Sequence, residues 1–101
     1  MILIYITAKD KEEAKKISRH LLEKKLVACT NIHPIGSMYW WDGRIEEDNE
    51  MVIIAKTKEE NYKKVEEEVK KIHSYTTPCI LKISAEANKE YLEWVEESLR
   101  P

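Results

Sequence analysis

Two residues in one short segment have side chains that could bind a metal ion. His73 and Cys79 stand on either side of residues 74–78, and an imidazole paired with a thiolate suits Cu(II) or Zn(II). Two ligands do not complete a metal site, so a third would come from Glu67, Glu68, a tyrosine or a second chain. The alternative is structural, in which His73 ends a helix and Cys79 is a buried thiol. We take His73 and Cys79 as the candidate metal site.

The sequence offers less support for catalysis than for metal binding. The sequence has no Gly-rich phosphate loop, HExxH motif or nucleophile elbow. A Cys/His pair without an orienting group is thin support for nucleophilic chemistry. The glutamate-rich segment VEEEVKK, residues 65–71, is typical of a solvated helix face with Glu to Lys pairs at i, i+4. We therefore predict that the protein is not an enzyme.

The segment YWWDGR, residues 39–44, carries three adjacent aromatic residues next to a turn signal. Asp42-Gly43 predicts a two-residue β-hairpin loop, because a type I′ turn needs positive φ at both central residues. The loop length fixes the strand register, which places Trp41 opposite Arg44 and Trp40 opposite residue 45.

The register divides these aromatic residues between two faces. Neighbouring strand residues point to opposite sides, so Trp40 lies on one face and Tyr39, Trp41 and Arg44 lie on the other. Each indole carries roughly 200 Å² of surface, worth up to about 5 kcal/mol when buried. We predict that Trp40 is mainly core and that another subunit buries the hairpin, with Tyr39, Trp40, Trp41 and Arg44 at the interface. The alternative is that both indoles pack within the chain under its last helix.

The elements that position these residues follow from hydrophobic periodicity. The predicted strands are residues 2–7, 26–32 with a continuation at 37–41, 44–56 and 79–85, and the predicted helices are residues 11–24, a second helix ending near His73 and a terminal helix after Asn88. A break is expected at His33-Pro34 and Gly36, with a bulge at the glycine. The order β-α-β-β-α-β predicts a single α+β, ferredoxin-like domain over residues 1–101, with both long helices on one face of an antiparallel sheet.

Polar residues mark where the predicted helices begin. Asp10 with Glu13, and Thr57 with Glu60, have capping-box spacing. Asn88 has the residue type of an N-cap for the terminal helix. We expect His20, on the first helix, to face solvent.

Composition excludes some partners and favours a cellular compartment. Seventeen Lys and Arg are interspersed with nineteen Asp and Glu, for a net charge of −2, which argues against nucleic acid as a partner, including for an RNA-recognition module. No apolar run approaches the roughly 20 residues that span a bilayer, so no membrane partner is expected. No secretory signal is recognisable, and the two cysteines fit free thiols in a reducing cytoplasm. Enrichment in Glu and Lys is typical of heat-stable proteins.

Five segments together resemble the CutA family of divalent-cation-tolerance proteins. They are LLEKKLVACTNI at 21–32, YWWDGRIEEDNE at 39–50, KT at 56–57, HSYTTPCI at 73–80 and YLEWV at 91–95. The resemblance implies a ferredoxin-like subunit in a compact cytoplasmic homotrimer, with the second and third strands pairing across subunits. It also implies a link to tolerance of copper and other divalent metals, with metal binding and no established enzymatic reaction or required cofactor.

The chain departs from the family pattern near the candidate metal site. Residues 73–78 read HSYTTP where the family has HPYE.P, and Cys79 stands where many members have an acidic residue. Residues 7–10 read TAKD in place of the usual TxPD. Because the family also resembles PII signal proteins, an alternative is a PII-like trimer that binds a small ligand or anion between subunits, using Lys56, Arg44 or other basic residues.

Overall fold

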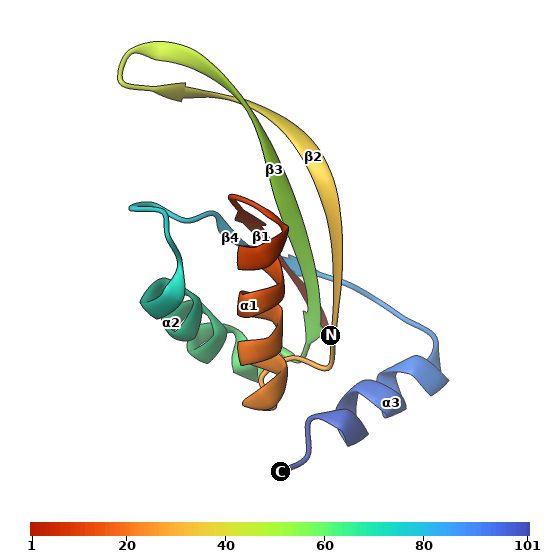
Figure 1. Ribbon diagram of the computed structural model, residues 1–101. Coiled ribbons are helices and arrows are strands. Elements are labelled where there is room, and N and C mark those ends of the chain that lie inside the picture. The colour runs from red at the N-terminus through yellow and green to blue at the C-terminus, as the bar shows by residue number, and fades with distance from the viewer.

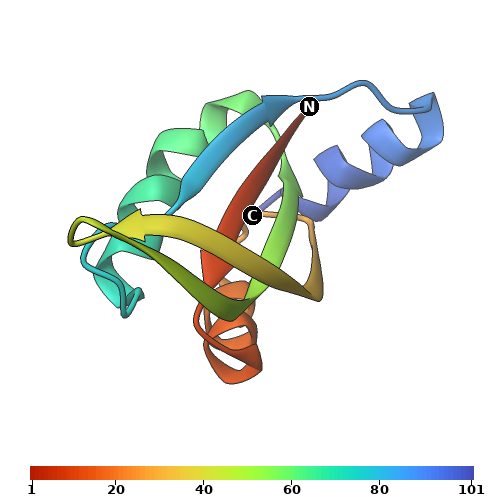
Figure 2. The same ribbon diagram turned by 90° about the horizontal axis from the view of Figure 1, so that it is seen from above.

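A four-stranded antiparallel sheet with two helices on one face forms the centre of the protein (Figures 1 and 2). The computed structural model describes all residues from 1 to 101. Its elements are β1 (Ile2–Ala8), α1 (Lys11–Glu23), β2 (Cys29–Trp41), β3 (Arg44–Thr57), the 3-10 helix η1 (Glu59–Asn61), α2 (Tyr62–Ile72), β4 (Ile80–Ser84) and α3 (Lys89–Ser98). The strand order is β2-β3-β1-β4, which confirms the predicted ferredoxin-like arrangement. None of the helices is long and apolar enough to cross a bilayer.

The hydrophobic core lies between the sheet and helices α1 and α2. Strand β1 is central, and its alternate residues Ile2, Ile4, Ile6 and Ala8 are buried, because alternate strand residues share one face. The core residues contributed by β3, α1 and α2 are Ile53, Ala55, Ala14, Ile17, Leu21, Val65 and Val69. The opposite face of the sheet is not covered by these helices.

The hairpin of β2 and β3 follows the predicted turn and register. Asp42 and Gly43 have φ values of 51° and 77°, as a type I′ turn requires. Trp41 is paired with Arg44 and Trp40 with Ile45. The hairpin extends well past the helices (Figure 1), and the longest dimension of the protein is 45 Å.

Both tryptophans of the hairpin are exposed in the single chain. Trp40 is 73% and Trp41 60% exposed. The prediction that Trp40 is mainly core is therefore wrong for one chain, because the hairpin tip lies beyond the helices that cover the sheet. The alternative, packing of both indoles under the last helix, is also wrong, since α3 lies at the opposite end of the molecule (Figure 1).

The predicted break in the second strand does not occur. Pairing of β2 with β3 runs without interruption from Cys29 to Trp41, across Pro34 and Gly36. Strand β2 is at the edge of the sheet, where a proline nitrogen can face away from the only neighbouring strand and remove no ladder hydrogen bond.

Capping differs between the three helices. At α1, Asp10 accepts a 2.8 Å hydrogen bond from the Glu13 N–H as predicted. The predicted cap at Thr57 is wrong: its hydroxyl donates to the Leu26 carbonyl at 2.7 Å, and η1 precedes α2. Asn88 occupies the N-cap position of α3 but makes no side-chain capping bond.

Candidate functional site

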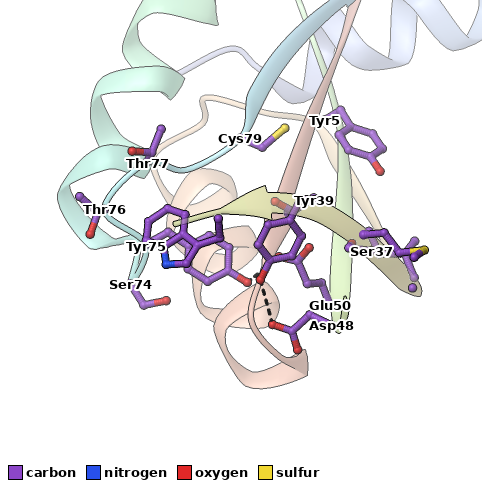
Figure 3. A pocket seen from close by; sticks show the side chains of 15 residues that line it. Tyr5, Ser37, Tyr39, Asp48, Glu50, Ser74, Tyr75, Thr76, Thr77 and Cys79 are labelled. Carbon is purple, nitrogen blue, oxygen red and sulfur yellow. Dashed lines mark hydrogen bonds between the residues drawn. The ribbon is translucent and has the colours of Figure 1, made fainter. Parts of the chain in front are cut away.

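A cavity of about 870 Å³ lies between the β2-β3 hairpin, β1 and the loop that joins α2 to β4 (Figure 3). It opens on the face of the sheet opposite α1 and α2, because its residue Tyr5 alternates with the core residues of β1. The lining residues are Tyr5, Thr7, Ile35, Gly36, Ser37, Met38, Tyr39, Trp41, Asp48, Glu50, Ser74, Tyr75, Thr76, Thr77 and Cys79. We call this space the hairpin cavity.

Glu13 fixes the position of the loop beside the hairpin cavity. Its side chain is buried, and its two carboxylate oxygens accept hydrogen bonds from the Lys9 N–H at 3.0 Å and the Ser74 N–H at 2.8 Å. Burial acts to raise the pKa of Glu13, but these hydrogen bonds and the nearby His73 outweigh it and hold the pKa below its ordinary value. The carboxylate therefore joins the start of α1 to the loop.

His73 makes two further hydrogen bonds that order this loop. Its Nε2 lies 2.7 Å from the Thr7 carbonyl oxygen, and its Nδ1 accepts from the Tyr75 N–H at 3.0 Å. A carbonyl only accepts and a main-chain N–H only donates, so Nε2 donates to Thr7 while Nδ1 accepts from Tyr75. Both ring nitrogens of His73 are therefore occupied by main-chain groups.

The candidate metal residues His73 and Cys79 flank the loop, but only Cys79 lines the hairpin cavity. Burial, followed by the charge of Glu50, raises the pKa of the Cys79 thiol, which favours the protonated form. No three His, Cys, Asp or Glu side chains of one chain are grouped so that they could hold a metal ion. The residues of a single chain therefore do not fit a closed metal site, and a metal on His73 and Cys79 would need ligands from elsewhere.

The carboxylates proposed as third ligands are engaged on α2. Glu68 is 2.8 Å from His20 and 2.9 Å from Lys71, and Glu67 is 3.8 Å from Lys64. His20 does not simply face solvent as predicted, because it hydrogen-bonds a carboxylate that is almost fully covered.

Two hydrogen bonds join tyrosine hydroxyls to carboxylates among the residues that line the hairpin cavity. The Tyr75 hydroxyl donates to Glu50 at 2.5 Å, and the Tyr39 hydroxyl donates to Asp48 at 3.2 Å. Burial and then these carboxylates raise the pKa of both phenols. Sequence reasoning missed Asp48 and Glu50. Their spacing of two residues on one predicted strand could have found them, because it places both carboxylates on the same face.

The predicted interface residues divide between two surfaces. Tyr39 and Trp41 line the hairpin cavity, whereas Trp40 lies on the opposite face. Arg44 and Lys56, the basic residues considered for anion binding, stand near opposite ends of β3, roughly 40 Å apart at the rise of an extended strand. Lys56 lies 5.5 Å from the Tyr91 ring centre. One chain does not bring Arg44 and Lys56 to a common ligand.

Comparisons with known proteins agree on one family. Residues 2–98 match the family described as CutA1 divalent ion tolerance protein. A relative from Archaeoglobus fulgidus named divalent-cation tolerance protein CutA is 53% identical over 97 residues, 95% of each chain. A relative of the same name from Thermotoga maritima is 46% identical over 100 residues, covering 98% of this chain and 99% of its own.

Solved structures give the same result. A structure from Archaeoglobus fulgidus, described as the periplasmic divalent cation tolerance protein CutA, has a TM-score of 0.95 at 51% identity over 99% of this chain and 100% of that one. CutA1 from Pyrococcus horikoshii has a TM-score of 0.96 at 37% identity over 100% of both chains. The resemblance found in the sequence is confirmed, and this chain belongs to the CutA1 divalent ion tolerance protein family.

Proposed function

We propose that the protein acts in divalent-cation tolerance as a homotrimer that binds divalent metal ions, Cu(II) among them. The names of the relatives support the tolerance role. One structural observation carries the assembly: large apolar side chains lie exposed on both faces of the hairpin and on the uncovered face of β4. They are Met38, Trp40, Trp41, Ile45, Leu81 and Ile83.

These side chains and the sheet edges together favour association with further copies of the chain. Strands β2 and β4 are the two edges of the sheet, and an edge presents unpaired N–H and C=O groups that can pair with another strand. An exposed apolar surface beside an open edge is costly in a monomer. A neighbouring copy that covered the hairpin would satisfy both surfaces.

Metal binding is proposed at Cys79 and His73, with the remaining ligands supplied by a neighbouring subunit. Binding at His73 would displace either the Thr7 carbonyl or the Tyr75 N–H from the imidazole. Both cysteines are free and half-buried, which makes Cys29 a matched control for Cys79. Cys29 is not part of the hairpin cavity.

Calorimetric titration of the intact protein with CuCl2 tests the metal proposal. Saturable binding that is lost in His73→Ala and in Cys79→Ala, and retained in Cys29→Ala, is the expected result. Equal binding by all four proteins would reject His73 and Cys79 as ligands. Growth of cells that lack their own tolerance protein, measured in copper-containing medium with each variant, then tests the tolerance role.

We also infer a cytoplasmic location and a function without catalysis. Two free thiols suit a reducing compartment. The bonded nitrogens of His73 and the raised pKa of Cys79 disfavour a Cys/His nucleophile. Cell fractionation tests the location, since recovery in the periplasm would contradict it.

The second candidate function is a PII-like trimer that binds a small ligand without a physiological metal. The size of the hairpin cavity favours it, because about 870 Å³ lies within the range of small-molecule sites. Copper titration separates the two functions, because a trimer that binds only a small organic ligand does not use His73 or Cys79 to bind a metal.

A further inference from the structure

We propose that the surface where helices α1 and α2 meet binds a polyphosphate anion between Lys24 and Lys64. This inference goes beyond the function proposed above and depends neither on a metal nor on the hairpin cavity. Both lysines belong to the layer of helices, on the side of the sheet opposite that cavity.

A buried carboxylate gathers nitrogen groups from both helices. Glu68, on α2, is only 3% exposed. Its Oε1 lies 2.8 Å from Nε2 of His20 and 3.7 Å from Nζ of Lys24, at the end of α1. Its Oε2 lies 2.9 Å from Nζ of Lys71 and 3.7 Å from Nζ of Lys64, both on α2. Each carboxylate oxygen therefore has one near partner and one lysine farther away.

The near partners satisfy the carboxylate and leave two lysines free. They are within hydrogen-bond distance of Glu68, one on each oxygen. The 3.7 Å separation of Lys24 and Lys64 from these oxygens is too long for a hydrogen bond. Lys24 has no other ion pair, and the other partner of Lys64 is Glu67, an exposed carboxylate at 3.8 Å. The N–H donors of both ammonium groups therefore remain available to a ligand.

The charge around these lysines is positive. The hydrogen bonds from Lys71 and then His20 outweigh burial and lower the pKa of Glu68 from 4.5 to about 2. Residues 11–25, which include α1, carry six Lys and Arg against three Glu, in a chain with a net charge of −2. Such a local surplus of positive charge attracts a multivalent anion.

The positions of the two lysines suit a ligand with more than one phosphate group. Lys24 follows α1 and Lys64 is in the first turn of α2, and they approach different oxygens of Glu68. A lysine ammonium group binds phosphate oxygens as a point charge. Linked phosphate groups can therefore contact both lysines at once, whereas a single phosphate carries less charge and makes fewer contacts.

This surface stays accessible in the proposed trimer. Helices α1 and α2 lie side by side on one face of the sheet (Figures 1 and 2), whereas neighbouring copies are proposed to cover the hairpin, the sheet edges and the opposite face. The side chains of Lys24 and Lys64 are 49% and 54% exposed. The ligand therefore does not compete with a neighbouring subunit for these lysines.

Calorimetric titration of the full-length protein with sodium triphosphate tests the proposal, in metal-free buffer with about 0.15 M KCl, a physiological ionic strength. Saturable binding of triphosphate is expected, with weaker binding of inorganic phosphate. Lys24→Gln and Lys64→Gln should each weaken triphosphate binding about threefold, and the double variant about tenfold. Neither substitution removes a hydrogen bond of Glu68, so the fold should persist, and Lys24→Arg should retain the binding.

Lys15→Gln is the matched control, because it makes the same charge change on α1 away from the site. Lys15 is exposed and nine positions before Lys24, which is about two and a half helical turns and places it on the opposite side of the helix. Its binding should equal that of the parent. If one Gln variant lacks the circular dichroism spectrum of the parent, the other carries the test.

Three results would overturn the proposal. Equal weakening by Lys15→Gln, Lys24→Gln and Lys64→Gln would show attraction by diffuse surface charge. Inorganic phosphate that binds as tightly as triphosphate would reject the polyphosphate class. Absence of saturable triphosphate binding to the parent would reject the site itself, whatever the result of the copper titration.

Discussion

The Glu13 carboxylate, in the first turn of α1, accepts a 2.8 Å hydrogen bond from the main-chain N–H of Ser74, 61 positions further along the chain. Its other oxygen accepts from the Lys9 N–H. A single buried side chain thus holds the loop that carries Tyr75 and Cys79 against the helix. The shape of the hairpin cavity depends on this contact.

Replacement of Glu13 by glutamine is expected to destabilise the protein. An amide has one acceptor oxygen, so one of the two N–H groups loses its partner, at a cost of about 1–3 kcal/mol. Urea unfolding at a fixed chain concentration measures the change. Glu12→Gln is the control, since Glu12 is exposed in the same turn, and equal losses in the two variants would contradict the role of Glu13.

The lowered pKa of Glu68 predicts that the free energy of unfolding decreases at acid pH. Hydrogen bonds from Lys71 and His20, with Lys24 nearby, lower its pKa from 4.5 to about 2. A lowered pKa in the folded state contributes stability that is present above the unfolded value and is lost as the pH falls through the folded one. The contribution should therefore disappear between pH 4.5 and about 2.

The difference between parent and Glu68→Gln isolates this contribution. The free energy of unfolding of the parent should exceed that of the variant at neutral pH, and the two should converge as the pH is lowered toward 2. Glu67 makes only an exposed contact to Lys64. The free energy of unfolding of Glu67→Gln should therefore change with pH in the same way as that of the parent. A constant difference for Glu68→Gln across this range would reject the assignment.

The two glycines of the hairpin should respond in opposite ways to alanine. Gly43 has a φ of +77°, which an L side chain adopts at a cost of about 1–2 kcal/mol. Gly36 lies in β2 and has nothing within 4 Å of an added Cβ. Gly43→Ala should therefore destabilise, while Gly36→Ala should leave the stability unchanged or raise it by up to about 1 kcal/mol. Thermal unfolding checks both, and a larger loss for Gly36→Ala would contradict the register.

Local signals in the sequence were sufficient to predict much of the fold. Asp42-Gly43 specified both the turn and the pairing of Trp41 with Arg44, because a two-residue loop allows one register. Asp10 marked the start of α1 correctly. The short apolar, β-branched run at residues 2–7 predicted the central strand.

Features that depend on tertiary context were not predictable from single residues. Pro34 and Gly36 suggested a break, but an edge strand tolerates both. Thr57 had capping-box spacing, yet its hydroxyl is used by the distant Leu26 carbonyl. Likewise, the pairing of Tyr75 with Glu50 brings together residues 25 positions apart, and no local pattern encodes it.

Trp41 should stabilise the assembly rather than the fold of one chain. It is 60% exposed in the single subunit, so Trp41→Ala is expected to weaken association by about 2 kcal/mol or more, as for an interface hot spot. The helical circular dichroism signal should stay unchanged. Sedimentation at several concentrations measures the association, with Leu22→Ala, an exposed apolar residue of α1, as the control. An equal effect of both variants would argue against a hairpin interface.

The mass of the protein in solution tests the central claim, that the exposed hairpin and sheet edges are covered by two further copies of the chain. Light scattering on a size-exclusion column at micromolar concentration should give three times the 12.0 kDa mass of one chain. A mass of 12.0 kDa under the same conditions would contradict the trimer and, with it, any metal site completed by a neighbouring subunit.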